Sequence, residues 1–216
     1  MNASVTPTPF FQKQTLTTFP KGMDSHKTVV IIPALNEERS IAHVIVSLPK
    51  SLLCEIIVVD NGSHDGTAEC ARTAGATVLT EPRRGYGNAC LLGIAHALKQ
   101  NPGVIAFVDG DLSDYPEELP KLLRPILEEG FDLVVGSRIL GERESGAMLP
   151  QALVGNTLAC FLIRLFWGQQ FTDLGPFRAV RVDALKRMNM NDKTFGWTVE
   201  MQVKAAKLKL KCVEVP

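Results

Sequence analysis

The sequence has no net charge, because its 23 basic residues are matched by 23 acidic ones. A general nucleic-acid binder carries a basic excess, so this balance excludes that class and predicts no nucleic-acid partner. The chain also lacks a run of about 18 uninterrupted apolar residues, which a membrane-spanning helix requires. Hydrophobic residues make up 45% and charged residues 21% of the chain, proportions that are typical of a soluble globular protein.

Cysteine and histidine are few and irregularly placed. The five cysteines include no Cys-x-x-Cys pair, and the four histidines lack the spacing of metal ligands. These absences predict reduced thiols in a cytoplasmic compartment and no zinc site. Residues 1–27 lack the apolar core of a signal peptide, so we interpret them as a flexible leader before one domain over 28–216.

From residue 28 onward, short apolar runs alternate with segments of helical spacing. The pattern predicts strands over 28–32, 55–59, 76–79, 104–108 and 132–136, with helices over 40–48, 67–74, 87–99 and 116–129. This alternation predicts an α/β fold with a parallel sheet covered on both faces. The rhythm then breaks, and we expect an irregular loop over 137–149, helices over 150–167, 182–188 and 197–207, and strands over 177–181 and 211–215.

Polar residues follow each of the first five predicted strands, and ligands of α/β sheets bind beyond those carboxyl ends. After the fourth strand, Asp109 and Asp111 flank Gly110, and two such carboxylates are suitable ligands for Mg²⁺ or Mn²⁺. The alternative is an ordinary turn, because Asp and Gly favour turns.

After the third strand, a glycine-rich segment that includes Gly85 and Tyr86 begins a helix. We expect its N-terminus near an anion, with Arg83 or Arg84 reaching phosphate; an ordinary helix-starting turn is the alternative, and for Tyr86 the preferred one.

Four segments together resemble family 2 glycosyltransferases of the GT-A fold. They are 33–38 (PALNEE), 58–67 (VVDNGSHDGT), 84–89 (RGYGNA) and 109–111 (DGD). The stretch 107–116 (FVDGDLSDYP) resembles the branch of dolichyl-phosphate mannose synthases and polyprenyl-phosphate glucosyltransferases. The resemblance implies a mostly parallel central sheet flanked by helices, with a nucleotide-sugar half over 28–140 and an acceptor half over 141–216. Relatives commonly continue beyond the acceptor half, so a C-terminally truncated catalytic domain is one expectation.

The resemblance implies roles for individual residues. Asp109 and Asp111 would hold Mg²⁺ or Mn²⁺, whereas Ser113 stands where relatives can have an additional Gln ligand. The expected nucleotide-sugar site comprises Pro33, Ala34, Leu35, Glu37, Asp60, Gly62, Arg84, Gly85, Asn88, Asp109, Gly110, Arg178 and Trp197. Two later segments, 172–179 (TDLGPFRA) and 196–201 (GWTVEM), resemble the acceptor-side elements of the family.

The implied reaction is an inverting, single-displacement transfer of a hexose from a UDP- or GDP-sugar. A polyprenyl or dolichyl phosphate acceptor is already anionic, and Arg138 or Arg178 would position it. A small soluble hydroxyl acceptor would instead need a base such as Asp173 or Glu200. The expected catalytic residues are therefore Asp109, Asp111, Asp173, Arg138 and Glu200.

Other classes remain as alternatives. A non-catalytic nucleotide-sugar-binding module would share the fold, but retention of both Asp109 and Asp111 favours an enzyme. A dinucleotide-dependent oxidoreductase would need a glycine fingerprint after the first strand, where Pro33-Ala34-Leu35 stands instead. The helix over 150–167 is either buried or lies in a membrane interface, where it would receive the lipid of the acceptor. The second possibility implies a location at the cytoplasmic face of a membrane.

Overall fold

The structure is a computed structural model that describes residues 27–141 and 150–216, with side chains in the helix that begins at Pro150 described from Val154 on. The expected leader, apart from Lys27, and most of the expected loop over 137–149 lie outside the described residues. The elements follow in the order β1 (Thr28–Ala34), α1 (Ile41–Ser47), η1 (Lys50–Leu52), β2 (Leu53–Asp60), α2 (Thr67–Thr73), β3 (Thr77–Thr80), α3 (Tyr86–Ala97), η2 (Leu98–Gln100), β4 (Val104–Phe107), η3 (Pro116–Glu118), α4 (Leu119–Glu129), β5 (Leu133–Gly136), α5 (Pro150–Trp167), β6 (Arg178–Arg181), α6 (Val182–Met188), α7 (Trp197–Lys207) and β7 (Cys212–Val215).

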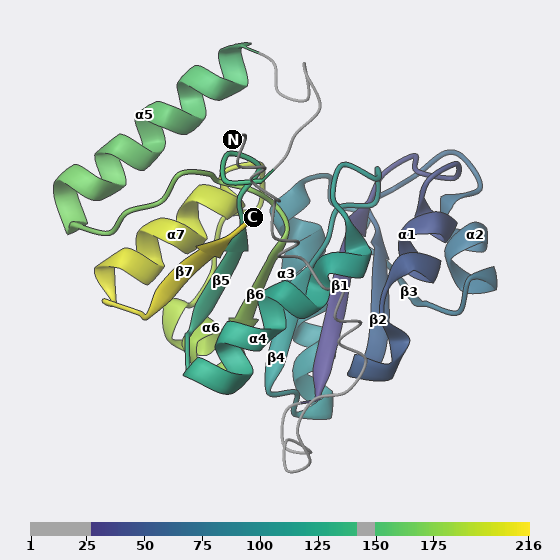
Figure 1. The fold of residues 1–216 in the computed structure, drawn as a ribbon. Helices are drawn as coiled ribbons and strands as arrows, with labels where there is room; N and C mark the ends of the chain where they lie inside the picture. The colour runs from purple at the N-terminus through teal and green to yellow at the C-terminus, as the bar shows by residue number, and fades with distance from the viewer. Residues whose placement is uncertain (1–26, 142–149) are drawn as a thin grey trace, which may run out of the picture.

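The strands form one mixed sheet in the order β3-β2-β1-β4-β6-β5-β7, which Figure 1 shows as the central layer. All neighbouring strands pair in parallel except β6, which runs antiparallel to both β4 and β5. The expected mostly parallel sheet is therefore confirmed. Apolar periodicity places a strand in the sheet but does not give its direction, so the reversal of β6 was not visible in the pattern.

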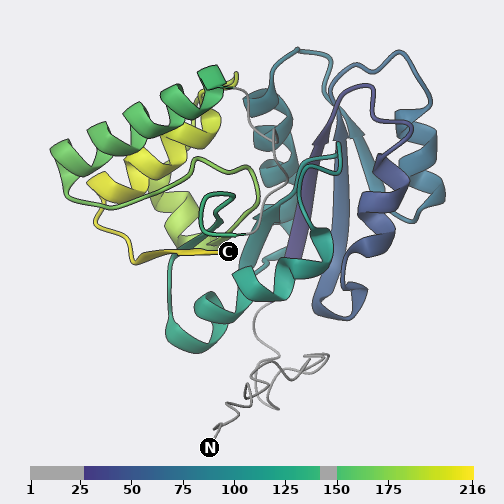
Figure 2. The ribbon, with the colours of Figure 1, turned by 45° about the horizontal axis from the view of Figure 1, so that its top comes forward.

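Helices cover both faces of the sheet. Along β1, Val29 and Ile31 belong to a core cluster with residues of α3, α6 and α7, whereas Val30 and Ile32 belong to a second cluster with residues of α1, α2 and α4 on the other face. Burial on both faces explains why β1 is a continuous apolar run, since neither set of alternating side chains meets water. Because β1 and β4 are parallel neighbours, the loops at their carboxyl ends lie at one edge of the sheet (Figure 2).

Helix α5 lies alongside α7 in both views (Figures 1 and 2). Cys160 and Ile163 of α5 pack there with Phe171 and Ala206 in a small cluster of their own. Within the described ranges, no helix is both long enough and apolar enough to cross a membrane.

Candidate active site

A cavity of about 540 Å³ opens at the carboxyl ends of β1 and β4. Its walls are formed by five separate stretches of the chain: the end of β1 with the loop after it, the residue after β2, the start of α3 with the residues before it, the turn after β4, and the segment before α7. The lining residues are Pro33, Ala34, Leu35, Glu37, Asn61, Arg84, Gly85, Tyr86, Asp109, Gly110, Asp111, Thr194 and Phe195. Most of the expected nucleotide-sugar residues thus share one cavity, at the sheet edge where the strand pattern places them.

Asp109 stands in the cavity wall just after the fully buried strand β4. Its Oδ1 accepts a hydrogen bond of 2.9 Å from the Tyr86 hydroxyl, and its backbone N–H donates to Asp114 Oδ2 at 3.2 Å. Burial raises the pKa of Asp109 to about 6, and the charge of Asp111 adds to this rise, while the Tyr86 hydrogen bond opposes it. Burial and the charge of Asp109 likewise raise the pKa of Asp114 to about 7. Three carboxyl groups therefore crowd within one turn.

The turn that contains Asp109 and Asp111 is suitable for a divalent cation that receives only some of its ligands from the protein. Within residues 27–141 and 150–216, no three His, Cys, Asp or Glu side chains are grouped as a complete metal site. Asp109 and Asp111 both line the cavity, and Mg²⁺ is commonly held by one or two carboxylates together with waters and substrate phosphate oxygens. The donor set is therefore suitable for a cation bound jointly with a diphosphate.

The loop after β1 forms the wall beside this turn. Glu37 accepts a hydrogen bond of 2.7 Å from the Ser40 hydroxyl, and its backbone N–H donates to Thr67 Oγ1 at 2.7 Å. Asp60, one of the expected nucleotide-sugar residues, is buried, and it accepts the Ser63 N–H at 3.1 Å outside the cavity lining. Its neighbour Asn61, which sequence reasoning missed, lines the cavity instead.

Of the two arginines before α3, only Arg84 lines the cavity. Its Nη2 lies 3.2 Å from the Gly62 carbonyl oxygen, to which it donates, and 3.1 Å from His64 Nε2. Arg83 instead donates to both carboxylate oxygens of buried Glu81, each at 2.9 Å, and this pairing lowers the pKa of Glu81 to about 2. Arg84 is therefore the candidate for contact with phosphate.

Two backbone amides in the first turn of α3 are paired with the segment before α7. The N–H of Gly87 donates to the Thr194 carbonyl oxygen, and the N–H of Asn88 donates to the Lys193 carbonyl oxygen, both at 3.1 Å. The approach is so close that a Cβ on Gly87 would lie 2.1 Å from the Asp192 carbonyl oxygen. The segment before α7 therefore satisfies the amides of Gly87 and Asn88, while Arg84, Gly85 and Tyr86 at the start of the helix line the cavity, so an anion near this N-terminus stays a prediction. Asn88 is a structural residue, whose side-chain amide donates to the carbonyl oxygens of the two preceding arginines.

The segment before α7 adds Thr194 and Phe195 to the cavity, and the phenyl ring of Phe195 is 84% exposed. Sequence reasoning missed both residues, although glycines at 85 and 87 were a usable sign that another backbone approaches there. Glu200 holds this segment, since its carboxylate accepts the N–H groups of Asn191 and Asp192 at 2.9–3.1 Å. It also pairs with Lys204 at 2.8 Å and lies outside the cavity lining.

Trp197 is fully buried and packs edge-on against Phe107 and Tyr86, with ring centroids 4.7 Å and 6.1 Å away. It therefore supports the Tyr86 ring from behind instead of lining the cavity. This packing explains how a tyrosine from a glycine-rich turn is held against Asp109.

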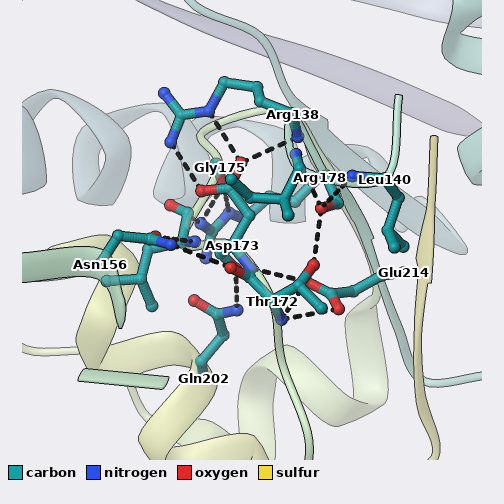
Figure 3. Close-up of polar contacts among 12 residues, drawn as sticks. Arg138, Leu140, Asn156, Thr172, Asp173, Gly175, Arg178, Gln202 and Glu214 are labelled. Carbon is teal, nitrogen blue, oxygen red and sulfur yellow. Dashed lines mark hydrogen bonds and ion pairs between the residues drawn. The ribbon is translucent and has the colours of Figure 1, made fainter. Parts of the chain in front are cut away.

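On the acceptor side, Arg138 and Asp173 form a two-point ion pair (Figure 3). Nε and the backbone N–H of Arg138 donate to Asp173 Oδ2 at 2.8 and 2.9 Å, and Nη2 donates to Oδ1 at 2.8 Å. Asp173 is fully buried, and burial alone raises its pKa, but the hydrogen bonds and charge of Arg138 outweigh burial and hold the pKa below its ordinary value. The pair is therefore stable as ions at neutral pH.

The turn around Asp173 is held from three elements (Figure 3). Asn156 of α5 donates to the Thr172 carbonyl oxygen at 2.9 Å, and Gln202 of α7 donates to the Asp173 carbonyl oxygen at 2.8 Å. Glu214 of β7 accepts the N–H groups of Thr172 and Asp173 at 2.8–3.0 Å. These contacts fix the carboxylate to which Arg138 is anchored.

Arg178 is fully buried beneath this turn. Its guanidinium donates to the carbonyl oxygens of Leu174, Gly175 and Thr198. Burial lowers the pKa of Arg178, although the surrounding anionic groups oppose this shift. Arg178 thus lies outside the cavity lining, but its charge, like that of Arg138, lowers the pKa of Asp109 and links the two halves of the site.

Comparison with known proteins adds independent findings. The profile of the family described as glycosyl transferase family 2 matches residues 29–188. An uncharacterized glycosyltransferase of Mycobacterium tuberculosis is 34% identical over 194 residues, which cover 89% of this chain and 85% of the relative. A UDP-N-acetylglucosamine–dolichyl-phosphate N-acetylglucosaminyltransferase of Methanococcus voltae is 29% identical over 208 residues, covering 87% of this chain and 83% of the relative.

A similar solved structure is that of glucosyl-3-phosphoglycerate synthase from Mycobacterium tuberculosis in complex with Mn²⁺, UDP and phosphoglyceric acid. Its TM-score is 0.72 at 25% identity, over 88% of this chain and 68% of that one. The family match extends from β1 to the end of α6, so it includes every cavity-lining residue except Thr194 and Phe195.

Proposed function

The chain belongs to glycosyl transferase family 2, and from this membership we propose that it moves a hexose from a UDP- or GDP-sugar to a polyprenyl or dolichyl phosphate. The GT-A fold and the glycosyltransferase class, both expected from the sequence, are confirmed by the family and structural matches. The observation that carries the proposal is the single cavity with Asp109 and Asp111 in one part of its wall and Arg84 in another. Arg84, together with a cation held by the two aspartates, would neutralise a sugar diphosphate from two sides.

The donor would lie with its diphosphate between Arg84 and the aspartate turn. Asp109 and Asp111 would hold Mg²⁺ or Mn²⁺, and the cation would neutralise charge on the departing nucleoside diphosphate. The Tyr86 hydroxyl keeps Asp109 Oδ1 oriented toward the cavity, and its hydrogen bond favours the ionised carboxylate. The nucleoside would contact the wall of Pro33, Ala34 and Leu35, with Glu37 near the ribose.

The state of the acceptor-side carboxylates supports a phosphate acceptor. Asp173 is occupied by Arg138, and Glu200 by backbone amides and Lys204. Neither is placed to remove a proton from a hydroxyl, whereas a lipid phosphate needs no strong base. Among the described residues, the pairing with Asp173 uses two side-chain N–H groups of Arg138, and its other guanidinium N–H groups would contact phosphate.

Two of the similar proteins point to different acceptors. The Methanococcus voltae relative is named for a dolichyl phosphate acceptor, and the mycobacterial structure contains phosphoglyceric acid. Because the carboxylates of Asp173 and Glu200 are already paired, we favour a lipid phosphate acceptor over a hydroxyl acceptor. Transfer to a small soluble hydroxyl acceptor is the second candidate, and a lipid acceptor would place the protein at the cytoplasmic face of a membrane.

The proposed donor and metal are tested by a thermal-shift panel of UDP, GDP and their sugars with and without Mn²⁺, because a bound ligand raises the apparent stability. We expect one nucleotide series to raise the melting temperature more with Mn²⁺ than without it. Asp111→Asn should lose the metal-dependent part of the shift and the transfer of labelled sugar to a polyprenyl phosphate. Asp183→Asn, an exposed acid on α6, is the matched control and should retain both. Unchanged transfer by Asp111→Asn would contradict the metal role.

A further inference from the structure

Helix α5 has one buried side and one apolar side that faces solvent. Its inner side chains Cys160 and Ile163 are 7% and 2% exposed, whereas Phe161 and Phe166 are 57% and 66% exposed. We define the α5 outer face as the exposed apolar residues Val154, Leu158, Phe161, Leu162, Leu165, Phe166 and Trp167. A buried helix would have this side covered as well, so the expectation of an ordinary buried helix is wrong for the outer face.

The α5 outer face is contiguous and is not a set of scattered apolar residues. Val154, Leu158, Phe161 and Leu165 follow one another at intervals of three and four, which places them along one side of a helix. Leu162 and Phe166 form a second row beside them. Single exposed apolar residues are normal, but a continuous patch on a soluble domain usually marks an interaction surface.

The charges around the α5 outer face suit an anionic partner. Arg164 of α5 is exposed, and no Asp or Glu occurs between residues 150 and 172. The C-terminal ends of α5 and α7 lie side by side in Figures 1 and 2, and there α7 and its following turn expose Lys207 and Lys209. Apolar side chains flanked by cations, with an aromatic pair at the helix end, are the pattern of a helix that lies in a lipid headgroup region.

The inner side of α5 is tied to the acceptor-side turn. Asn156 donates to the Thr172 carbonyl oxygen at 2.9 Å and accepts the Leu174 N–H at 2.8 Å, so it holds the backbone on both sides of Asp173. The carboxylate of Asp173 in turn anchors Arg138 (Figure 3). A bilayer in contact with α5 would therefore lie beside the arginine that we assign to the acceptor phosphate.

We propose that the α5 outer face docks on an anionic lipid bilayer, with Phe161, Leu165 and Phe166 inserted at the boundary between headgroups and acyl chains. The inference rests on the proposed function, because a polyprenyl phosphate is presented by a membrane. A second copy of the chain fits this face less well. A twofold pair through the α5 outer face would bring like charges of Arg164 and the α7 lysines together, with no carboxylate on α5 to pair them.

The test uses vesicles of phosphatidylcholine with and without phosphatidylglycerol, and the fluorescence of Trp167. The chain has two tryptophans, and Trp197 is fully buried, so a blue shift on adding vesicles reports Trp167. We expect co-sedimentation and a blue shift with the anionic vesicles, both weakened by salt. Phe161→Asp and Phe166→Asp should each weaken binding about tenfold or more, because each removes a phenyl ring from the lipid contact. Val46→Asp, at an equally exposed apolar position on α1, is the matched control and should bind normally.

Separate readouts distinguish this inference from the proposed function. The two Asp variants should keep the nucleotide-induced thermal shift and transfer to a short-chain, water-soluble prenyl phosphate, while transfer to long-chain polyprenyl phosphate in vesicles falls. Vesicle binding unchanged in both variants, or absent in the wild type, would overturn the docking inference even if transfer occurs. A dimer of the wild type that both variants dissociate, without vesicle binding, would assign the face to a second copy and also overturn it. Normal docking without any prenyl phosphate transfer would leave the inference intact and refute the proposed acceptor.

Discussion

The Tyr86 hydroxyl donates a 2.9 Å hydrogen bond to Oδ1 of Asp109, and this contact joins the start of α3 to the turn after β4. Trp197 and Phe107 pack behind the two residues and hold the tyrosine ring in place. A side chain that the sequence favours as an ordinary turn residue thereby opposes the effect of burial and favours the ionised form of the carboxylate proposed to hold the cation.

Tyr86→Phe should weaken Mn²⁺ binding in the presence of nucleotide by about tenfold, which is the effect of losing one hydrogen bond to a charged group. The hydrogen bond lowers the pKa of Asp109, so its removal raises that pKa further. The acidic limb of the pH–activity profile should therefore move to higher pH. Isothermal titration and the pH dependence of kcat/KM measure the two effects.

The matched control for this variant is the only other tyrosine in the chain. Tyr115 is 57% exposed and lies outside the cavity lining, so Tyr115→Phe should bind Mn²⁺ normally. Equal Mn²⁺ affinities for Tyr86→Phe and the wild type would contradict the assigned role of the hydroxyl.

The stability of the metal-free protein should fall as pH rises from about 4 to about 7. Asp109 and Asp114 have pKa values of about 6 and about 7 in the folded state, compared with an ordinary value of 3.8. In this window the folded protein binds more protons than the unfolded chain, so a rise in pH favours unfolding. Asp114→Asn should reduce the loss of unfolding free energy by roughly 1–3 kcal/mol, as measured by urea denaturation in a chelator.

Glu81→Gln serves as a control for the pH window. The pKa of Glu81 is lowered to about 2, so the stability that it contributes is lost only in acid, below its ordinary value of 4.5. Glu81→Gln should therefore leave the slope between about pH 6 and pH 7, the upper part of the same window, unchanged. A slope for Asp114→Asn that matches the wild type would show that Asp114 does not titrate in this range.

Gly87→Ala should destabilise the protein by about 2 kcal/mol and raise the KM for the donor, because the new Cβ would meet the Asp192 backbone at 2.1 Å. The segment with Thr194 and Phe195 would have to move away from the cavity. Gly155→Ala on α5 has nothing within 4 Å and should instead stabilise the helix by about 0.5–1 kcal/mol. Chemical denaturation and donor kinetics of the two variants give the comparison. A Gly87→Ala protein with wild-type KM would indicate that the segment does not shape the cavity.

Part of the site could be predicted because strands that alternate with helices are expected to lie parallel in one sheet. Pro33 lies at the carboxyl end of β1, Asp109 and Asp111 lie in the turn after β4, and the carboxyl ends of parallel strands meet at one edge. Local order alone therefore brings these residues together. Thr194 and Phe195 could not be found in this way, since they reach the cavity through backbone contacts with a segment about a hundred residues earlier.

Tertiary contacts also decided which of two arginines with the same sequence-based expectation is available to a ligand. Arg83 and Arg84 are neighbours in sequence, but buried Glu81 takes the first and leaves the second at the cavity. Arg138 and Arg178 were both candidates for the acceptor, and the fold encloses only Arg178 among backbone carbonyls. A residue type indicates which chemistry is available, whereas its partners decide whether that chemistry faces a ligand.

The sequence by itself determined the alternation of strands and helices, the sheet edge that carries the site, and the aspartate pair after β4, because these depend on apolar periodicity and on neighbours in the chain. Only the tertiary structure decided the reversal of β6, the closure of the α3 N-terminus by residues 193 and 194, and the outward turn of the apolar side of α5. Each of these depends on which distant part of the chain hydrogen-bonds to the segment or covers its apolar side chains. The periodicity of one segment carries no information about that partner.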